Sequence, residues 1–134
     1  MKNYISKEEI NDLDLYKYDG DLVVVTTADE AARAAIKLKA SKVLGFDTET
    51  RPNFSKKTNY KVCLLQLSDD ECAYLFRLKM FEMPRLLVEV LEDPNIVKVG
   101  VAIRDDIIEL KNEYHVNVQG GFELQTEAKE QKIE

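Results

Sequence analysis

VLGFDTET, residues 43–50, is the stretch that decides the fold, because it ends an apolar run with two closely spaced carboxylates. Successive side chains of a strand point to opposite faces, so Asp47 and Glu49 are predicted to share one face and Thr48 to point to the other. Two acids beside a hydrophobic core repel each other and are costly to desolvate unless a cation or hydrogen-bond donors compensate them. The stretch therefore predicts a strand that ends in a metal site.

Oxygen ligands alone favour a hard ion, Mg²⁺ or Mn²⁺, over zinc, which prefers nitrogen and sulfur. Ions of this kind usually serve chemistry on phosphates. A second interpretation stays open for the two acids taken alone. They can be the solvated end of a strand, with Asp47 starting a turn and Glu49 paired to Arg51 or a nearby lysine.

Outward from this strand, hydrophobic periodicity and turn residues predict an α/β domain. Thr27 and Glu30 form a capping box that opens a helix ending near Ser41. The apolar face of this helix is expected to comprise Ala28, Ala31, Ala32, Ala35, Ile36 and Leu38. The expected strands are residues 22–26, 43–49, 62–67, 72–76 and 96–102, of which the second to fourth form an antiparallel meander. Two further helices are expected at residues 84–92 and 105–114.

A third acid is expected at the same edge of the sheet. A helix that crosses between two strands of one sheet favours parallel pairing, so strand 96–102 can lie beside strand 43–49. The carboxyl ends of both strands then meet, which brings Asp105 and Asp106, at the start of the last helix, toward Asp47 and Glu49. Successive helical residues point about 100° apart, so both aspartates cannot face one cation equally well. The alternative is that they only cap free N–H groups of the first helical turn.

The composition is typical of one cytoplasmic domain. At 134 residues the chain can bury about two-thirds of the surface that its unfolded form exposes, so disulfides are not needed. Cys63 and Cys72 lie in apolar runs without metal-binding spacing, and no secretory signal or membrane span precedes them. The formal net charge of -6 argues against nucleic-acid binding through overall basic charge.

One short stretch departs from this acidity. Residues 51–61, RPNFSKKTNYK, contain four basic residues and no acid, with Phe54 and Tyr60 among them. Cations combined with aromatic rings can bind phosphates and stack bases. The alternative is a solvated loop between two strands.

Four strings in order resemble the DEDD superfamily of 3′-to-5′ exonucleases, of the ribonuclease D and Werner-helicase exonuclease type. They are GFDTET (45–50), KVCLLQL (61–67), CAYLFRL (72–78) and KVGVAIRDDIIEL (98–110). Together they are far more specific than a lone D-x-E. The resemblance covers residues 22–125 and implies a ribonuclease H-like mixed sheet, with the meander and a parallel fourth strand flanked by helices. It leaves residues 1–21 as an N-terminal arm and residues 126–134 as a charged tail.

The resemblance also implies hydrolysis of nucleotides from the 3′ ends of single-stranded DNA or RNA by a two-metal mechanism with Mg²⁺ or Mn²⁺. It assigns Asp47, Glu49 and Asp106 as the catalytic, metal-binding acids, with Asp105 as the second choice for the third. The expected nucleic-acid contacts are the backbone at Thr48, stacking on Phe54, and phosphate steering by Lys56, Lys57 and Lys61.

The resemblance stops before the family's third motif, which carries a fourth metal-binding Asp and a Tyr or His that positions water. We therefore expect a C-terminally shortened domain with impaired turnover, and neither Tyr114 nor His115 is placed to fill the gap. The alternative is a catalytically inactive module of the same fold that binds nucleic acid or protein. An apolar surface left by missing helices would favour a homo-oligomer.

Overall fold

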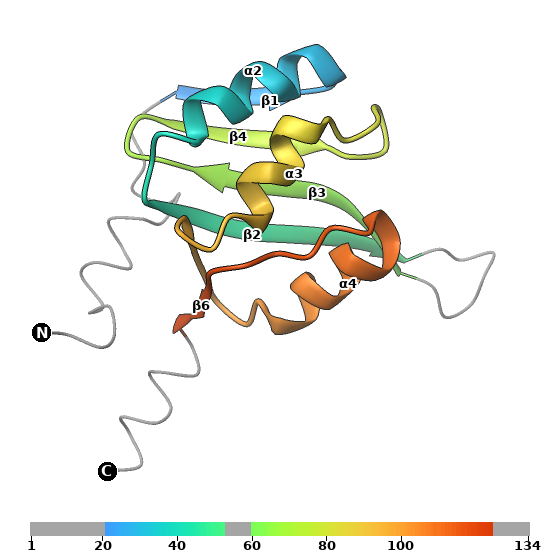
Figure 1. Cartoon of the computed structure of the whole chain (residues 1–134). Helices are drawn as coiled ribbons and strands as arrows, with labels where there is room; N and C mark the ends of the chain where they lie inside the picture. Colours follow the sequence, from blue (N-terminus) through green and yellow to red (C-terminus); the bar gives the residue numbers. More distant parts are fainter. Residues whose placement is uncertain (1–20, 53–59, 125–134) are drawn as a thin grey trace, which may run out of the picture.

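The computed structural model describes residues 21–52 and 60–124, which form one six-stranded sheet and three helices (Figure 1). The strands are β1 (Asp21–Val25), β2 (Val43–Pro52), β3 (Tyr60–Ser68), β4 (Cys72–Arg77), β5 (Val97–Gly100) and β6 (Gly121–Glu123). The helices are α2 (Ala28–Leu38), α3 (Arg85–Glu92) and α4 (Arg104–Tyr114). Among these helices none combines the length and the apolar composition needed to cross a bilayer.

The sheet order is β1-β4-β3-β2-β5-β6. Strands β2, β3 and β4 pair antiparallel, and β5 pairs parallel to β2, so the predicted meander and parallel fourth strand are confirmed. The parallel edge strand β6 was not predicted from the sequence. It is only three residues long and contains a glycine, so its pairing with β5 rather than its own pattern makes it a strand.

All three helices lie on one side of the sheet (Figure 1). Each connects two parallel strands and steps across the sheet in the same direction, and such crossovers share one hand. The core therefore forms between the helices and one sheet face, where Phe46, Leu65 and Phe76 meet Leu38 and Leu87.

The opposite sheet face carries exposed apolar side chains in β1 and at the start of β2, whereas Ser68, Ala73 and Val99 on the same face are buried. The strand registers place Leu22 and Val24 of β1 and Val43 of β2 on the same face as Asp47. Their exposed fractions are 61%, 51% and 42%. No helix of the described ranges covers this face.

Helix α2 confirms the capping box and corrects its predicted apolar face. Thr27 accepts a hydrogen bond from the N–H of Glu30, and the Glu30 carboxylate accepts one from the N–H of Thr26. Ile36, which we expected in the apolar face, is 59% exposed, and Ala34 is buried in its place. The helix buries only the narrow stripe at 31, 34, 35 and 38 that faces the sheet and α3, and Ile36 lies about 100° beyond Ala35.

Candidate functional site

Asp47 and Glu49 end the buried part of β2, as predicted. Both are exposed and share one sheet face, whereas the side-chain oxygen of Thr48 is buried on the helix side. Asp47 Oδ1 accepts a hydrogen bond of 2.9 Å from the N–H of Thr48. Directly after Glu49 the pairing with β3 shifts, because Glu49 pairs with Leu64 and Thr50 with Val62. This bulge lies beside the two acids, where bulges commonly redirect side chains.

Asp106 of α4 is the aspartate that faces β2. It is half-buried, whereas Asp105 is exposed. Burial raises the pKa of Asp106, and the charges of Asp47, Asp105 and Glu109 raise it further. The hydroxyl of Thr48 faces the same carboxyl and partly offsets this rise in pKa, although no well-formed hydrogen bond to a described residue satisfies the buried hydroxyl oxygen. The structure therefore brings Asp47, Thr48 and Asp106 together across β2 and α4.

The donor chemistry of Asp47 and Asp106 fits a hard divalent cation. Mg²⁺ and Mn²⁺ prefer carboxylate oxygens as ligands, and a bound cation would offset the mutual repulsion of the two acids. Glu49 lies on the same sheet face as Asp47 but does not complete a three-ligand group. No three His, Cys, Asp or Glu side chains within residues 21–52 and 60–124 are grouped to hold a metal ion.

The other expected contacts with nucleic acid are not placed by the structure. Phe54, Lys56 and Lys57 lie outside the described residues, as do the expected N-terminal arm through residue 20 and the charged tail. Lys61 belongs to β3, where it pairs with Arg51, but its side chain also lies outside the described part. His115 is the exposed C-cap of α4, with a φ of 61°, and lies a helix length away from Asp106.

Sequence reasoning missed Glu113, which contacts β3 over a separation of 51 residues. Its carboxylate accepts a hydrogen bond from the N–H of Val62 and pairs with Lys79. An acid near the end of an amphipathic helix gives no sequence signal for such a contact, because solvated acids are usual there.

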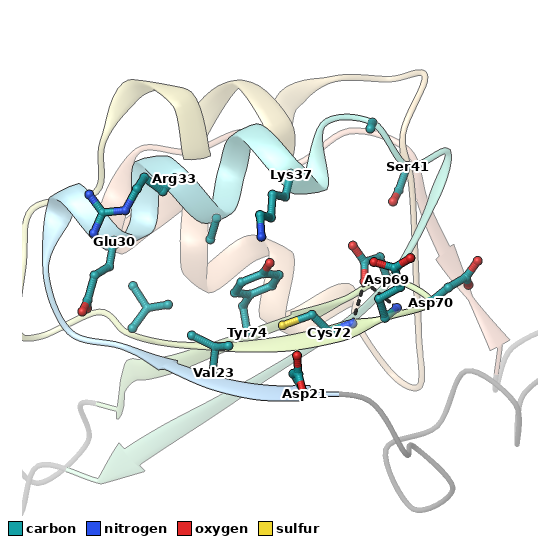
Figure 2. A pocket seen from close by; sticks show the side chains of 14 residues that line it. Asp21, Val23, Glu30, Arg33, Lys37, Ser41, Asp69, Asp70, Cys72 and Tyr74 are labelled. Atoms are coloured by element: carbon teal, nitrogen blue, oxygen red, sulfur yellow. Dashed lines mark hydrogen bonds between the residues drawn. The ribbon is translucent and has the colours of Figure 1, made fainter.

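A separate groove of about 780 Å³ lies between α2 and the edge formed by β1 and β4. Figure 2 shows Arg33 and Lys37 along its helix side, Tyr74 at its floor, and Asp69 and Asp70 near its other end. None of its lining residues belongs to β2 or α4. Asp69 is used locally, since its Oδ1 accepts hydrogen bonds from the N–H groups of Glu71 and Cys72.

Comparison with known proteins identifies similar domains over nearly the same residues. The model of a family described as 3′-5′ exonuclease matches residues 22–133. The chain is 43% identical over 86 residues to exonuclease 3′-5′ domain-containing protein 2 of Drosophila melanogaster, which covers 62% of this chain and 14% of that protein. It is 28% identical to the bifunctional 3′-5′ exonuclease/ATP-dependent helicase WRN of Mus musculus, over 96% of this chain and 10% of that protein. The chain thus spans a small part of both curated relatives.

Solved structures show the same arrangement of elements. The EXD2 exonuclease domain soaked in Mn and dGMP superposes with a TM-score of 0.71 at 30% identity, over 84% of this chain and 60% of that chain. The same domain has been solved after soaking in Mg and GMP, with an equal TM-score. Trypanosoma brucei RNase D in complex with RNA U12 superposes with a TM-score of 0.69 over 81% of this chain and 39% of that chain. Its identity of 21% supports the fold alone.

Proposed function

Because the chain belongs to the 3′-5′ exonuclease family, we propose that it removes nucleotides from the 3′ ends of single-stranded DNA or RNA in a reaction that requires Mg²⁺ or Mn²⁺. The observation that carries the proposal is that α4 places Asp106 half-buried against β2, where burial and, to a smaller extent, the charge of Asp47 raise its pKa. The two acids are 59 residues apart in the sequence, and a purely solvated role would give Asp106 no reason to be half-buried near a second acid.

Asp47 and Asp106 would hold the ion, and Glu49 would add a ligand from the same sheet face as Asp47. When bound, a divalent ion stabilises the charge that develops on a phosphate under attack. Thr48 contributes from the other side of β2, where its hydroxyl faces the carboxyl of Asp106 and partly offsets the rise in its pKa. The basic stretch at residues 51–61 remains the predicted contact for the phosphates of the strand.

A second candidate function is a binding module without turnover. It is favoured by the absence of a grouped third acid among the described residues. Such a module would bind a single strand through cations and aromatic rings without cutting it.

The test is degradation of 5′-labelled single-stranded DNA and RNA with Mg²⁺ or Mn²⁺. We expect a ladder that shortens from the 3′ end, that EDTA abolishes, and that Asp47→Asn and Asp106→Asn each reduce by at least about 100-fold. Glu89→Gln, which changes an exposed acid on α3, is the matched control and should cut like the unchanged protein. Retention of the labelled strand without any cleavage at high protein concentration would reject the exonuclease and leave the binding module.

A further inference from the structure

Helix α4, which carries Asp106, has little apolar surface to hold it on the sheet. Leu110 is its only fully buried residue, whereas Ile108 is 48% exposed. Ile107 and Tyr114 pack only partly against the core. Polar contacts at the ends of α4 therefore have to fix the direction in which Asp106 points.

At the C-terminal end of α4, Glu113 and Tyr114 form hydrogen bonds with the backbone of one β3 residue, Val62. Glu113 Oε1 accepts a hydrogen bond of 2.8 Å from the N–H of Val62, and the Tyr114 hydroxyl donates one of 2.6 Å to the C=O of Val62. Strand β4 no longer pairs here, because its register with β3 ends at Leu64. The two side chains, which we call the Val62 clamp, thus take the place of a neighbouring strand and satisfy both peptide groups.

Lys79, which follows β4, completes the clamp. Its Nζ lies 2.7 Å from Glu113 Oε2 and 5.3 Å from the centre of the Tyr114 ring. Burial lowers the pKa of Lys79, but the contacts with Glu113 and Tyr114 outweigh this effect and leave the pKa raised. The Glu113 side chain is 12% exposed and the Lys79 side chain 49%, so the carboxylate of this pair is shielded from solvent while the ammonium side is half exposed.

The clamp and Asp106 lie on the same face of α4. Seven residues separate Asp106 from Glu113, which is about two helical turns. Val62 pairs with Thr50, the residue that follows Glu49, across the bulge beside the acids. At the other end of α4, the N–H of Arg104 donates to the Glu123 carboxylate. Both helix ends are thus tied to the sheet, and the C-terminal tie ends next to the acid-bearing part of β2.

We propose that the Val62 clamp is a positioning device, in which Glu113 and Tyr114 set the rotation and height of α4 so that Asp106 faces Thr48 and Asp47. The effect of the clamp on catalysis rests on the proposed exonuclease function, whereas its effect on the placement of α4 and Asp106 does not. Neither residue touches the acids, so the clamp acts on Asp106 only through the helix.

The activity test uses Tyr114→Phe, which removes the hydroxyl and keeps the ring, and Glu113→Ala, with Glu89→Gln as the control. We expect kcat to fall about 10- to 100-fold while KM changes less than about twofold, because a small misplacement of a reacting group has effects of this size. Glu113→Gln should restore much of the lost kcat, since its amide oxygen can still accept from Val62. An unchanged kcat in folded Tyr114→Phe and Glu113→Ala, or a rise in KM alone, would overturn the positioning role.

A readout independent of activity is the amide ¹H–¹⁵N spectrum of the metal-free chain. If the clamp positions α4, Tyr114→Phe should shift the amide signal of Asp106, which lies about two helical turns away on α4. It should also shift the amide signal of Thr48 on β2. Shifts confined to the surroundings of Val62 and Lys79 would overturn it. If the unchanged protein does not cut nucleic acid but these distant shifts are present, the clamp stands and the proposed function fails.

Discussion

At the scale of single residues, Asp106 is held in a place that disfavours its charge. Burial is the main cause of its raised pKa, and the nearby acids add to it. A carboxyl whose pKa is higher in the folded than in the unfolded chain binds more protons when folded, between those two pKa values. Stability therefore falls as the pH rises through this window in the absence of a cation.

Replacing Asp106 by Asn should stabilise the metal-free protein at neutral pH. The uncharged amide removes both the desolvation of a carboxylate and its repulsion by Asp47. Thermal unfolding in EDTA at several pH values between about 4 and 7 checks this, and the gain should shrink toward the acidic end. A lower melting temperature of Asp106→Asn at pH 7 would contradict the unfavourable desolvation and repulsion that we assign to the Asp106 carboxylate.

Lys98 is a second residue whose environment the sequence did not reveal. It is fully buried in β5, and its Nζ donates to the backbone oxygens of Asp93, at 2.8 Å, and Gln119, at 2.9 Å. Burial lowers its pKa to about 8, against the opposing attraction of Asp93. The neutral amine still has two N–H groups, so loss of the proton leaves both hydrogen bonds possible.

Lys98 should make the protein more stable as the pH rises from about 8 to about 10, where the unfolded chain still binds this proton and the folded chain does not. Denaturant titrations at both pH values, compared with Lys98→Met, isolate this contribution from other titrating groups. Lys98→Met should also cost about 1 to 3 kcal/mol, because it removes the donor from two partly buried carbonyls. A pH dependence identical in both proteins would refute the assignment.

At the scale of elements, the site depends on the close contact of β5 with β2. Gly100 ends β5, and a Cβ atom there would overlap the backbone oxygen of Phe46 and the side chain of Ile103. A side chain at position 100 would therefore push β2 and the start of α4 apart. Asp47 lies on β2 and Asp106 near the start of α4, so the same substitution would also move these two acids apart.

Gly100→Ala should lower the free energy of unfolding by about 1 to 3 kcal/mol, as is typical of overpacked positions. Gly121→Ala is the matched control, because a Cβ atom there would meet only the flexible ends of Ile107 and Ile103. Urea titrations of both variants provide the measurement. Equal losses at the two positions would show that the close approach of Phe46 is not what requires glycine.

Local patterns predicted most elements. The capping box at Thr27 and Glu30 marked the start of α2, and alternating apolar residues located β2, β3 and β4. The patterns failed where pairing or packing outweighs local preference. β6 is a strand only because β5 pairs with it, and Ile36 is exposed because α2 buries a narrow stripe.

At the scale of the whole molecule, the helices share one side of the sheet and leave some apolar side chains exposed on the other. On that side Leu22 and Val24 of β1 and Val43 of β2 are exposed on the same sheet face as Asp47, with β4 and β3 between the two strands. Exposed apolar surface of this kind tends to be buried by association.

We predict that the chain self-associates through this face at tens of micromolar. Sedimentation velocity of the unchanged protein and of Val24→Lys tests this, since a charge on the sheet face should return it to a monomer. Ile36→Lys is the control, because Ile36 is also exposed but lies on α2, on the other side of the sheet. A monomer at this concentration, or an equal effect of both lysines, would exclude association through the sheet.

The sequence by itself determined the strands, the helix starts and the acids at the end of β2, because side-chain periodicity, caps and turn residues act over a few neighbouring positions. It also favoured Asp106 over Asp105 through the resemblance of its motifs. Only the tertiary structure decided that Asp106 lies against Thr48 and that Lys98 is buried. The same holds for the hydrogen bonds of Glu113 and Tyr114 with the backbone of Val62. These contacts join residues that are mostly distant in the sequence, so their energies come from packing and desolvation that no local pattern encodes.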